Sequence, residues 1–308
     1  MLGNERQWQK LGKILAPDPA VPWMVSHTGA SMAVPIDGGP EFDVYVTGRD
    51  ARNRSHIGKV RLTLEGEPRV TSIDPAAVFA PGEDGTFDEN GVSYPSMVHV
   101  GNHFYMYYVG WVPTVNTGFQ NDAGLARAVA GTDDWQRVSR APILPRTDSE
   151  PFGTGSVQVL KEGDRWRLWY TVFLRWGKGP DEHRHYYVIR HADSDDGVHW
   201  RRSEHACIGI EDPSEYAVGK PSVVKLGGTY HMWYVHRGEQ YRIGYAHSQD
   251  GLEWTRRDDI AGIGVGPSSW DDTAICYPHV FQYGDALYMT YCGNEYGRGG
   301  LGLARLPL

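Results

Sequence analysis

An acidic residue recurs ahead of one register point in four segments of the chain. These acids are Glu89, Glu150, Glu215 and Asp272, and a second carboxylate stands beside two of them, at Asp88 and Asp271. Carboxylates that converge raise one another's pKa, which suits a general acid near neutral pH. Cleavage of a glycosidic bond requires such a pair, one protonating the leaving oxygen and one acting as base or nucleophile. The alternative is a structural device, in which the recurring acid bonds backbone N–H groups of a turn in every segment.

The acids divide into predicted roles. We expect Glu150 and Glu215 to form the acid–base pair, with Asp271 and Glu89 tuning that pair or binding substrate. Other polar residues near the same register point are expected to bind substrate: His27, Asp88, Tyr94, Lys220, Asp272 and Tyr277.

Aromatic and arginine-rich loops supply a second set of candidates. Trp111 and Trp176 lead into the insertions 112–123 and 175–186, and loops of this kind often carry function. An aromatic face there could stack on a sugar ring, with Arg175 bonding hydroxyl or carboxylate groups. Comparable positions later in the chain are occupied by Arg237, Asn294, Glu295 and Arg298. By contrast, Trp166, Trp169, Trp233 and Trp254 lie within expected strands and are interpreted as packing residues.

One sequence motif is repeated five times, roughly every 60 residues, and it predicts the elements that position these residues. Its clearest copy covers 221–234, and further copies cover 31–46, 95–108, 155–170 and 278–291. Each repeat holds three or four short runs rich in Val, Tyr, Trp and Met, bounded by Gly, Asp and Pro, which is typical of strands joined by hairpins. Asp-Gly pairs at 196–197 and 250–251 favour tight turns with positive φ. No sustained helical stripe occurs, so the chain is predicted to be all-β.

Five four-stranded blades fit the length, which predicts a five-bladed β-propeller forming a single domain over residues 1–308. The last repeat stops at its third strand, 300–305, and the N-terminal run 8–15 resembles the outer strand at 135–144. We therefore expect residues 8–15 to complete the fifth blade and close the ring, which satisfies two sheet edges at once. In a propeller the segments ahead of the innermost strands form the mouth of a funnel, where the carboxylates would converge.

Composition limits the kinds of partner, cellular location and cofactor that are expected. The net charge of −8 with no basic block argues against nucleic acid, and no apolar run approaches a membrane span or a signal peptide. The three cysteines show no metal-type spacing and are read as reduced thiols of a cytoplasmic protein, although a disulfide between Cys276 and Cys292 stays open. No cofactor is expected. His27 and His279 are interpreted as hydrogen-bonded residues, with a structural cation in the axial channel as the alternative.

The repeated motif resembles that of the five-bladed propeller glycoside hydrolases, the arabinofuranosidase, xylosidase and fructosidase superfamily of the family 43 and 32 type. The resemblance covers nearly all of the chain, through Pro-Ser-Val-Val-Lys-x-Gly-Gly-x-Tyr-x-Met-Trp-Tyr and Ile-Gly-Tyr-Ala-x-Ser-x-Asp-Gly-x-x-Trp. A closer resemblance, to propellers found among bacterial polysaccharide-biosynthesis genes, rests on the segments 87–91, 150–152, 270–278 and 293–298. It implies a small-molecule or oligosaccharide substrate.

The sequence departs from that family where its catalytic residues stand. The resemblance implies an aspartate base in the first blade, an aspartate in the second and a glutamate acid in the third, each close to the first proline of the inner strand. Here the first blade offers Ser26 and His27, and the residues before the later prolines are Tyr94, Lys220 and Tyr277. The familiar triad therefore does not carry over, and the acids of a glycosidase would have to come from the displaced set.

Three functions follow from these residues. The first is a glycosidase-like enzyme that uses the paired carboxylates. The second is a non-hydrolytic enzyme, such as a cyclase, isomerase or lyase of polysaccharide or natural-product biosynthesis, which the Lys and Tyr positions favour. The third is a carbohydrate-binding propeller without catalysis. Fold alone does not choose among them, because function depends on the site, and the sequence leaves the oligomeric state open.

Overall fold

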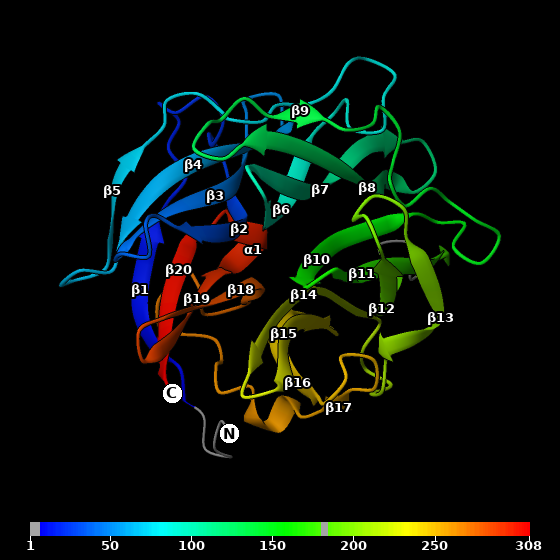
Figure 1. The fold of residues 1–308 in the computed structure, drawn as a ribbon. Coiled ribbons are helices and arrows are strands. Elements are labelled where there is room, and N and C mark those ends of the chain that lie inside the picture. The colour runs from blue at the N-terminus through cyan, green and yellow to red at the C-terminus, as the bar shows by residue number, and fades with distance from the viewer. Residues whose placement is uncertain (1–6, 180–183) are drawn as a thin grey trace. The chain divides into compact units, whose positions relative to one another are not determined.

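A computed structural model describes residues 7–179 and 184–308, and nearly all of its regular structure is β-strand (Figure 1). Runs rich in Val, Tyr and Trp form strands because β-branched and aromatic side chains fit a pleated, half-buried surface. The described helical elements are two single turns, η2 (Asp258–Ile260) and α1 (Asn294–Gly297). The all-β prediction is confirmed.

Two sheets contain four consecutive antiparallel strands each, as the repeat predicts. The first is formed by β2 (Thr28–Pro35), β3 (Glu41–Arg49), β4 (Ser55–Thr63) and β5 (Arg69–Ile73). The second is formed by β6 (Val92–Val100), β7 (His103–Thr114), β8 (Gly118–Val129) and β9 (Gln136–Arg137).

A third sheet brings the two ends of the sequence together. Its strands are β18 (Cys276–Tyr283), β19 (Ala286–Cys292), β20 (Leu301–Pro307) and β1 (Gln9–Leu15). Strand β1 pairs antiparallel with β20, so the blue and red strands lie side by side in Figure 1. The N-terminal run thus supplies the fourth strand that the last repeat lacks, which confirms the predicted pairing.

The remaining strands form one eight-stranded sheet made of two four-stranded halves. One half contains β10 (Thr154–Glu162), β11 (Arg165–Trp176), β12 (His185–Ser194) and β13 (Arg201–Ile208), and the other β14 (Ala217–Leu226), β15 (Thr229–Arg237), β16 (Tyr241–Ser248) and β17 (Thr255–Arg256). A single parallel pairing, Tyr187 with Ala217, joins the halves. The repeat therefore gives five groups of four strands.

The protein divides into two compact units, each with its own core. One contains residues up to Phe79 together with 222–235 and 240–308, and the other contains 80–221 with 236–239. Trp233, Tyr291 and Leu287 belong to the core of the first unit, and Tyr107, Trp166 and Leu168 to that of the second. Burial of Trp166, Trp169 and Trp233 confirms that these tryptophans are packing residues.

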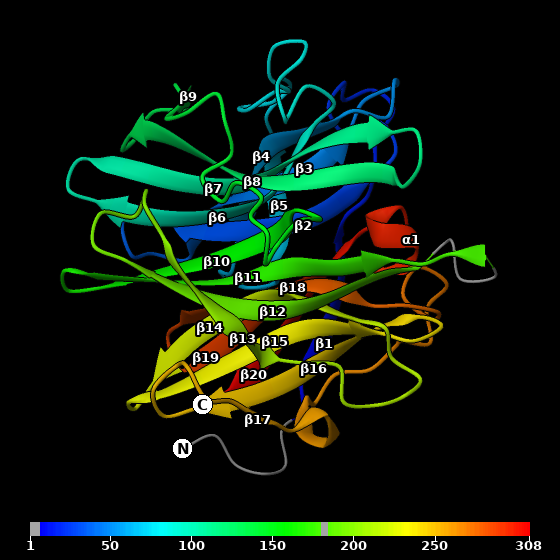
Figure 2. The ribbon, with the colours of Figure 1, turned by 90° about the vertical axis from the view of Figure 1, so that its right-hand side faces the viewer.

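The two insertions that were expected to be loops are mostly strand. Strands β7 and β8 stay paired out to Thr114 and Gly118, and β11 and β12 stay paired out to Trp176 and His185, so both hairpins appear as long ribbons in Figure 2. Aromatic side chains extend each hairpin because they pack on one another. The expectation of loops at 112–123 and 175–186 is therefore corrected.

The two Asp-Gly pairs adopt positive φ as predicted, at Gly197 and Gly251. The connection is wider than a two-residue hairpin, however. The Ser194 hydroxyl accepts the backbone N–H groups of Asp196 and Gly197, and the Asp196 carboxylate accepts the next two, so side chains replace the ladder bonds of a tight turn. Ser248 and Asp250 repeat the arrangement.

Candidate active site

Three of the six predicted carboxylates, Asp88, Glu150 and Asp271, take part in a structural device that we call a clamp. A clamp consists of a carboxylate, a tyrosine hydroxyl from the second strand of a four-stranded group, and a basic side chain from its fourth strand. In the first example the Tyr108 hydroxyl donates to Asp88 Oδ2 at 3.0 Å and Arg137 Nε donates to the same oxygen at 2.8 Å. Asp88 is fully buried. Burial, with help from the Asp88 charge, raises the pKa of Tyr108, which keeps its hydroxyl a donor.

Glu150 forms the most extensive clamp. It accepts the Tyr170 hydroxyl at 2.7 Å, Arg190 Nη1 at 3.1 Å and Arg202 Nη1 at 2.7 Å, and only 1 % of it is exposed. The arginines compensate the cost of burying the charge. These contacts assign Glu150 a structural role, so we do not retain it as half of an acid–base pair. A cavity of about 480 Å³ adjoins this clamp, lined in part by Arg190, Arg202 and Glu204.

Asp271 closes the clamp of the sheet that joins the two ends of the sequence. It accepts Lys10 Nζ from β1 at 2.7 Å and the Tyr291 hydroxyl at 3.2 Å, and it is 2 % exposed. Its neighbour Asp272 is exposed and bonds Asn294 Nδ2 and the Thr273 hydroxyl, which lowers the pKa of its carboxyl. We therefore withdraw Asp271 from the catalytic set, and Asp272 serves as a turn residue.

The clamp of the fourth group takes its acid from elsewhere. Ser214 stands where Asp88 and Asp271 stand in their repeats, and the Tyr234 hydroxyl donates instead to Asp258 at 2.5 Å, with Arg256 Nε at 2.8 Å on the other oxygen. Glu215 comes one residue after Ser214, at the position that Glu89 and Asp272 occupy in their repeats, and like those two acids it lies outside the clamp.

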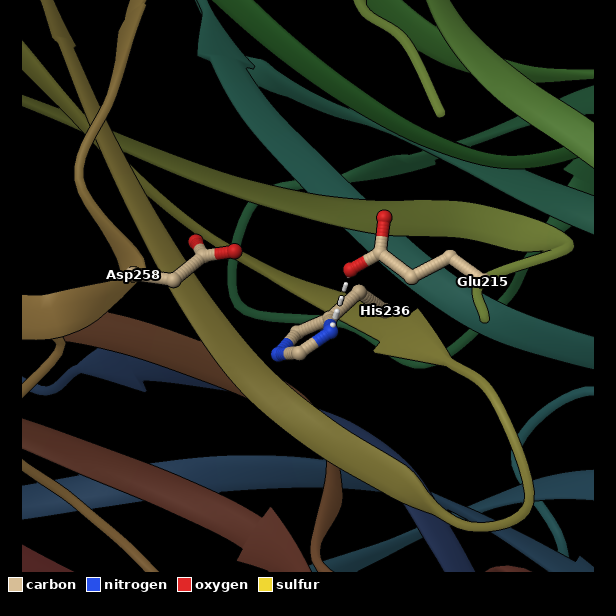
Figure 3. A group of neighbouring side chains, drawn as sticks. All are labelled: Glu215, His236 and Asp258. Atoms are coloured by element: carbon tan, nitrogen blue, oxygen red, sulfur yellow. Dashed lines mark ion pairs between the residues drawn. The ribbon is translucent and has the colours of Figure 1, made fainter. Parts of the chain in front are cut away.

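Glu215 instead pairs with a histidine. His236 Nδ1 lies 2.8 Å from Glu215 Oε1, the dashed contact in Figure 3. The carboxylate side chain is 7 % exposed and the imidazole 22 %, so the imidazole is the more accessible partner. A carboxylate held against an imidazole can orient the ring and stabilise its protonated form, which is the arrangement of an acid–base pair.

Sequence reasoning missed His236, although the repeats contain a signal for it. His236 follows Tyr234 at the spacing by which Gly110 follows Tyr108 and Gly293 follows Tyr291. A Cβ at Gly110 would lie 2.4 Å from the Asp88 Cβ, and one at Gly293 would lie 2.1 Å from the Trp270 carbonyl oxygen. In these two repeats the preceding loop lies too close to allow any residue other than glycine. In the fourth group the preceding loop differs and leaves room for a histidine.

The residues before the three inner-strand prolines share an unusual backbone. Tyr94, Lys220 and Tyr277 have φ of 54°, 50° and 56°, in the left-handed region that non-glycine residues rarely adopt. Bulges interrupt the strand register there, between Ser93 and Ser96 and between Cys276 and His279. Each such residue costs about 1–3 kcal/mol, and this kind of strain clusters at functional sites. The sequence predicts that these residues lie near the site, but it does not predict their left-handed backbone conformation.

Lys220 is the most buried of the three and lies in the same unit as Glu215. Only 4 % of it is exposed, and its backbone N–H donates to Thr171 Oγ1 at 3.2 Å. The Thr171 hydroxyl also contacts the Ser156 hydroxyl at 3.0 Å. Thr171 of β11, itself held by Ser156 of β10, thus anchors the left-handed backbone of Lys220 in β14.

A cluster of arginines and tyrosines follows Glu215 and His236 on the same strand ends. The backbone N–H of Tyr216 donates to the Arg237 carbonyl at 2.9 Å, and the Arg237 guanidinium lies 5.4 Å from the Tyr216 ring centre. Arg184 lies 5.2 Å from the same ring, and Arg175 stacks on Tyr186 at 3.4 Å. The structure therefore brings the predicted Arg175 and Arg237 into one cluster.

The predicted aromatic platforms are placed differently from each other. Trp176 stacks on Phe173 with an interplanar angle of 6° and is packed edge-on by Phe119 from the neighbouring hairpin. These contacts explain Trp176 as a packing residue between hairpins. Trp111 is half-buried on β7 opposite Asn121.

Glu89 is half-buried, and its carboxylate accepts the Gly85 backbone N–H, a turn contact.

The other unit holds the predicted residues His27, Tyr277, Glu295 and Arg298. His27 is 8 % exposed and its Nδ1 lies 2.8 Å from the Ser26 hydroxyl. Burial, then the charges of Arg49 and Arg298, lower the pKa of His27 to about 4, so the ring is neutral at neutral pH. Arg298 pairs with Glu295 at 3.2 Å on the surface.

Tyrosines surround the strained turns of this unit. The Tyr241 ring lies 5.9 Å from that of Tyr277 and 5.7 Å from that of Tyr296. Glu295 and Tyr296 both have positive φ, 53° and 61°, so two consecutive non-glycine residues are held in the left-handed region. Asn294 anchors this turn through its side-chain oxygen Oδ1, which accepts the backbone N–H groups of Thr273 and Ala274.

Asp122 is a buried acid that sequence reasoning did not single out, because it lies in the segment expected to be a loop. It is 5 % exposed, and one carboxylate oxygen accepts Gln120 Nε2 at 2.6 Å while the other has no hydrogen-bond partner among the described residues. Burial raises the pKa of Asp122 to about 6, against the opposing charges of Arg146 and Arg202.

Two further predictions concern cysteines and membranes. All three cysteines are free thiols, including Cys276 and Cys292, which face each other in the β18–β19 register. No helix in residues 7–179 and 184–308 combines the length and apolar character needed to cross a bilayer. The alternative interpretation of His27 and His279, a structural cation in the axial channel, stays untested.

Comparison with known sequences places the protein in a family. No family model matches the sequence. Two proteins of Mycobacterium tuberculosis, "Uncharacterized protein MT1551" and "Uncharacterized protein Rv1502", are each 39 % identical to it over 299 residues, which is 97 % of this protein and 99 % of theirs. The protein belongs to their family.

Solved structures identify the fold. A putative glycoside hydrolase from Bacteroides ovatus superposes with a TM-score of 0.75 at 13 % identity, covering 100 % of this protein and 97 % of that one. A second glycosyl hydrolase from Bacteroides ovatus has a TM-score of 0.73 at 14 % identity, covering 95 % and 90 %. A thermostable family-43 glycoside hydrolase has a TM-score of 0.65 at 17 % identity, covering 94 % and 91 %. The protein thus has the fold of propeller-type glycoside hydrolases, as its repeats predicted.

Proposed function

We propose that the protein is an enzyme acting on a glycosidic bond or a sugar-derived substrate, and that Glu215 and His236 form its acid–base pair. The observation that carries this proposal is the pairing of Glu215, a carboxylate that lies outside any clamp, with a partly exposed histidine. Asp88, Glu150 and Asp271 are buried against tyrosine and a basic side chain, whereas Glu215 contacts a partly exposed imidazole. Only an acid outside a clamp can exchange a proton without dismantling a buried ion pair.

The chemistry follows from the exposure of the pair. The imidazole is positioned to transfer a proton to or from the substrate, and Glu215 sets the ring orientation. General acid–base catalysis of this kind contributes about 10²–10⁴-fold to a rate. Fold neighbours that are glycoside hydrolases favour a sugar substrate for such a pair.

The architecture that we propose is a single domain of five blades spanning residues 1–308. The five groups of four strands are its blades, and the pairing of β1 with β20 completes the last of them. Sequence features further favour a role in polysaccharide biosynthesis in the cytoplasm, with a small molecule or oligosaccharide as substrate.

Turnover by matched variants tests the acid–base pair. On a panel of nitrophenyl glycosides and oligosaccharides, Glu215→Gln should lower kcat by about 10²-fold or more while the protein keeps its melting temperature. His236→Gln should produce a similar loss and remove one limb of the pH–rate profile. Glu239→Gln, an exposed acid in the same unit, is the control. Unchanged turnover by Glu215→Gln would refute the assignment.

A non-hydrolytic reaction in the same fold is the second candidate, favoured by the strained turns at Lys220 and Tyr277. A buried lysine can act as a base or form an imine with a carbonyl substrate, which hydrolysis does not need. In that case Lys220→Met or Tyr277→Phe should lower turnover more than Glu215→Gln does. A binding propeller without catalysis would show no turnover in any assay and would lose sugar affinity with Trp111→Ala.

A further inference from the structure

The connection between β19 and β20 contains three consecutive residues with a left-handed backbone. Glu295, Tyr296 and Gly297 have φ of 53°, 61° and 99°. Glycine adopts this region freely, whereas a residue with a side chain adopts it at a cost in free energy. Tyr296 therefore occupies a position where glycine would relieve strain.

The glycines of this connection are required because the backbone around them is crowded. A Cβ at Gly297 would lie 2.4 Å from the Thr28 carbonyl oxygen, and one at Gly299 would lie 2.4 Å from the Trp270 carbonyl oxygen. These close approaches fix the backbone directly after Tyr296. A strained conformation persists only where its surroundings impose it in this way, and such strain clusters at functional sites.

Burial does not offset the strain at Tyr296. The residue is 43 % exposed, more than any other Phe, Tyr or Trp in the described part of the protein. Its ring meets that of Tyr241 edge to face at 5.7 Å, and further contacts also hold it, but they leave this area open to solvent. Tyr241 and its neighbour Tyr277 are 6 % and 9 % exposed, so the exposed ring rests on a buried aromatic base. The side chain is better explained by the surface that it presents than by packing.

The turn lies at the end of its sheet where β18, the first strand of the group, begins. Successive strands are antiparallel, so the connection between the second and third strands returns to the end at which the first strand starts. Asn294 Oδ1 accordingly accepts the backbone N–H of Ala274, just ahead of β18. On the other side, the hydroxyl of Thr28, the first residue of β2, donates to the Gly297 carbonyl at 3.4 Å (Figure 1). Tyr296 therefore belongs to the end of the sheets where the sequence predicts substrate binding.

We propose that Tyr296 is a stacking platform for a sugar ring of an oligosaccharide, supported from below by Tyr241 and Tyr277. The ligand class rests on the proposed function, and Tyr296 binds the sugar without taking part in proton transfer. A tyrosine ring offers a large, rigid surface with only two side-chain torsions to order. The negative face of the ring attracts the positively polarised C–H groups of a sugar ring. A platform that is already fixed before binding loses little conformational entropy when the sugar arrives.

Saturation-transfer difference NMR tests the platform without turnover. The probes are arabinotriose, xylotriose and mannotriose, and saturation should pass from the wild-type protein to the ring C–H protons of at least one of them. Tyr296→Ala should raise the dissociation constant of that trisaccharide by about tenfold. Tyr296→Phe keeps the aromatic ring and should retain the affinity.

Two further variants separate binding from structure. Tyr296→Gly should lose the affinity as Tyr296→Ala does but melt at a higher temperature, because glycine accepts the left-handed backbone. Tyr283→Ala is the matched control, since Tyr283 makes an edge-to-face contact of the same length, 5.7 Å to Phe42, at the opposite end of the same sheet. It should lower the melting temperature and leave trisaccharide binding unchanged.

The outcomes separate the platform from the acid–base pair. Affinity that survives Tyr296→Ala, affinity lost equally in Tyr283→Ala, or no saturation transfer to any of the three probes would overturn the platform. Turnover that depends on Glu215 would in that case leave the proposed function standing. Binding that depends on Tyr296, in a protein whose turnover is unchanged by Glu215→Gln, would support the platform and remove the acid–base proposal.

Discussion

Removal of the Glu150 charge should destabilise the protein strongly, because two largely buried arginines depend on it. Glu150→Gln preserves the side-chain shape and leaves Arg190 and Arg202, which are 14 % and 15 % exposed, without their counter-charge. Breaking a buried ion pair by neutralising one partner costs about 3–5 kcal/mol. An unfolding entropy of about 2.1 cal/mol/K per residue converts a loss of about 4 kcal/mol into a melting temperature lower by about 6 °C for a protein of this length.

Thermal melting by circular dichroism measures this effect directly. Glu204→Gln is the control, because Glu204 is exposed and lines the same cavity beside the clamp. Tyr170→Phe should cost less, about 1–3 kcal/mol, since it removes one donor and keeps both arginine contacts. A Glu150→Gln protein that melts like Glu204→Gln but has lost turnover would refute the clamp interpretation and restore Glu150 to the catalytic set.

Two pH effects of opposite sign should also be measurable. Asp122 has its pKa raised from 3.8 to about 6 in the folded state, so its contribution is full below pH 4 and is lost as pH rises through 6. Asp122→Asn should therefore stabilise the protein above pH 7 by about 3 kcal/mol, and denaturant unfolding that shows no gain there would contradict the buried carboxyl. His27 has its pKa lowered from 6.5 to about 4, so stability should fall by about 3 kcal/mol as pH drops from 6.5 to 4. His27→Gln should flatten that acid limb and the exposed His205→Gln should not; equal limbs in both variants would show that His27 is not held neutral.

The fold could be predicted because its determinants are local and repeated. Short stretches of consecutive residues determine the strands, the positive φ of Gly197 and Gly251, and the missing strand of the last repeat. The pairing of β1 with β20 could be inferred for the same reason, since an unfilled edge and a matching strand sequence occur at opposite ends of the sequence. Hairpin length was the exception, because it depends on contacts between hairpins, such as Phe119 with Trp176.

The site could be predicted only in part, because residue type does not reveal a partner distant in sequence. Glu150 and Glu215 are both acids ahead of an inner strand, yet one meets Arg202 from a strand that follows it and the other meets His236. The clamps depend on which side chain the fourth strand offers. A sequence read without those pairings assigns the same chemistry to both acids.

Departures from the repeat are the better guide to function in this protein. Where a group keeps the residues of the repeat, those polar residues stabilise the sheet. Asp88 and Asp271 occupy equivalent positions, and each accepts a tyrosine hydroxyl. The fourth group breaks the rule at once in two places, with Ser214 in the acid position and His236 in place of glycine. Asp258 makes the clamp contacts that Ser214 cannot make, so the fold is maintained. The histidine in the glycine position contacts Glu215, so a demand on the Glu215–His236 pair best explains that change.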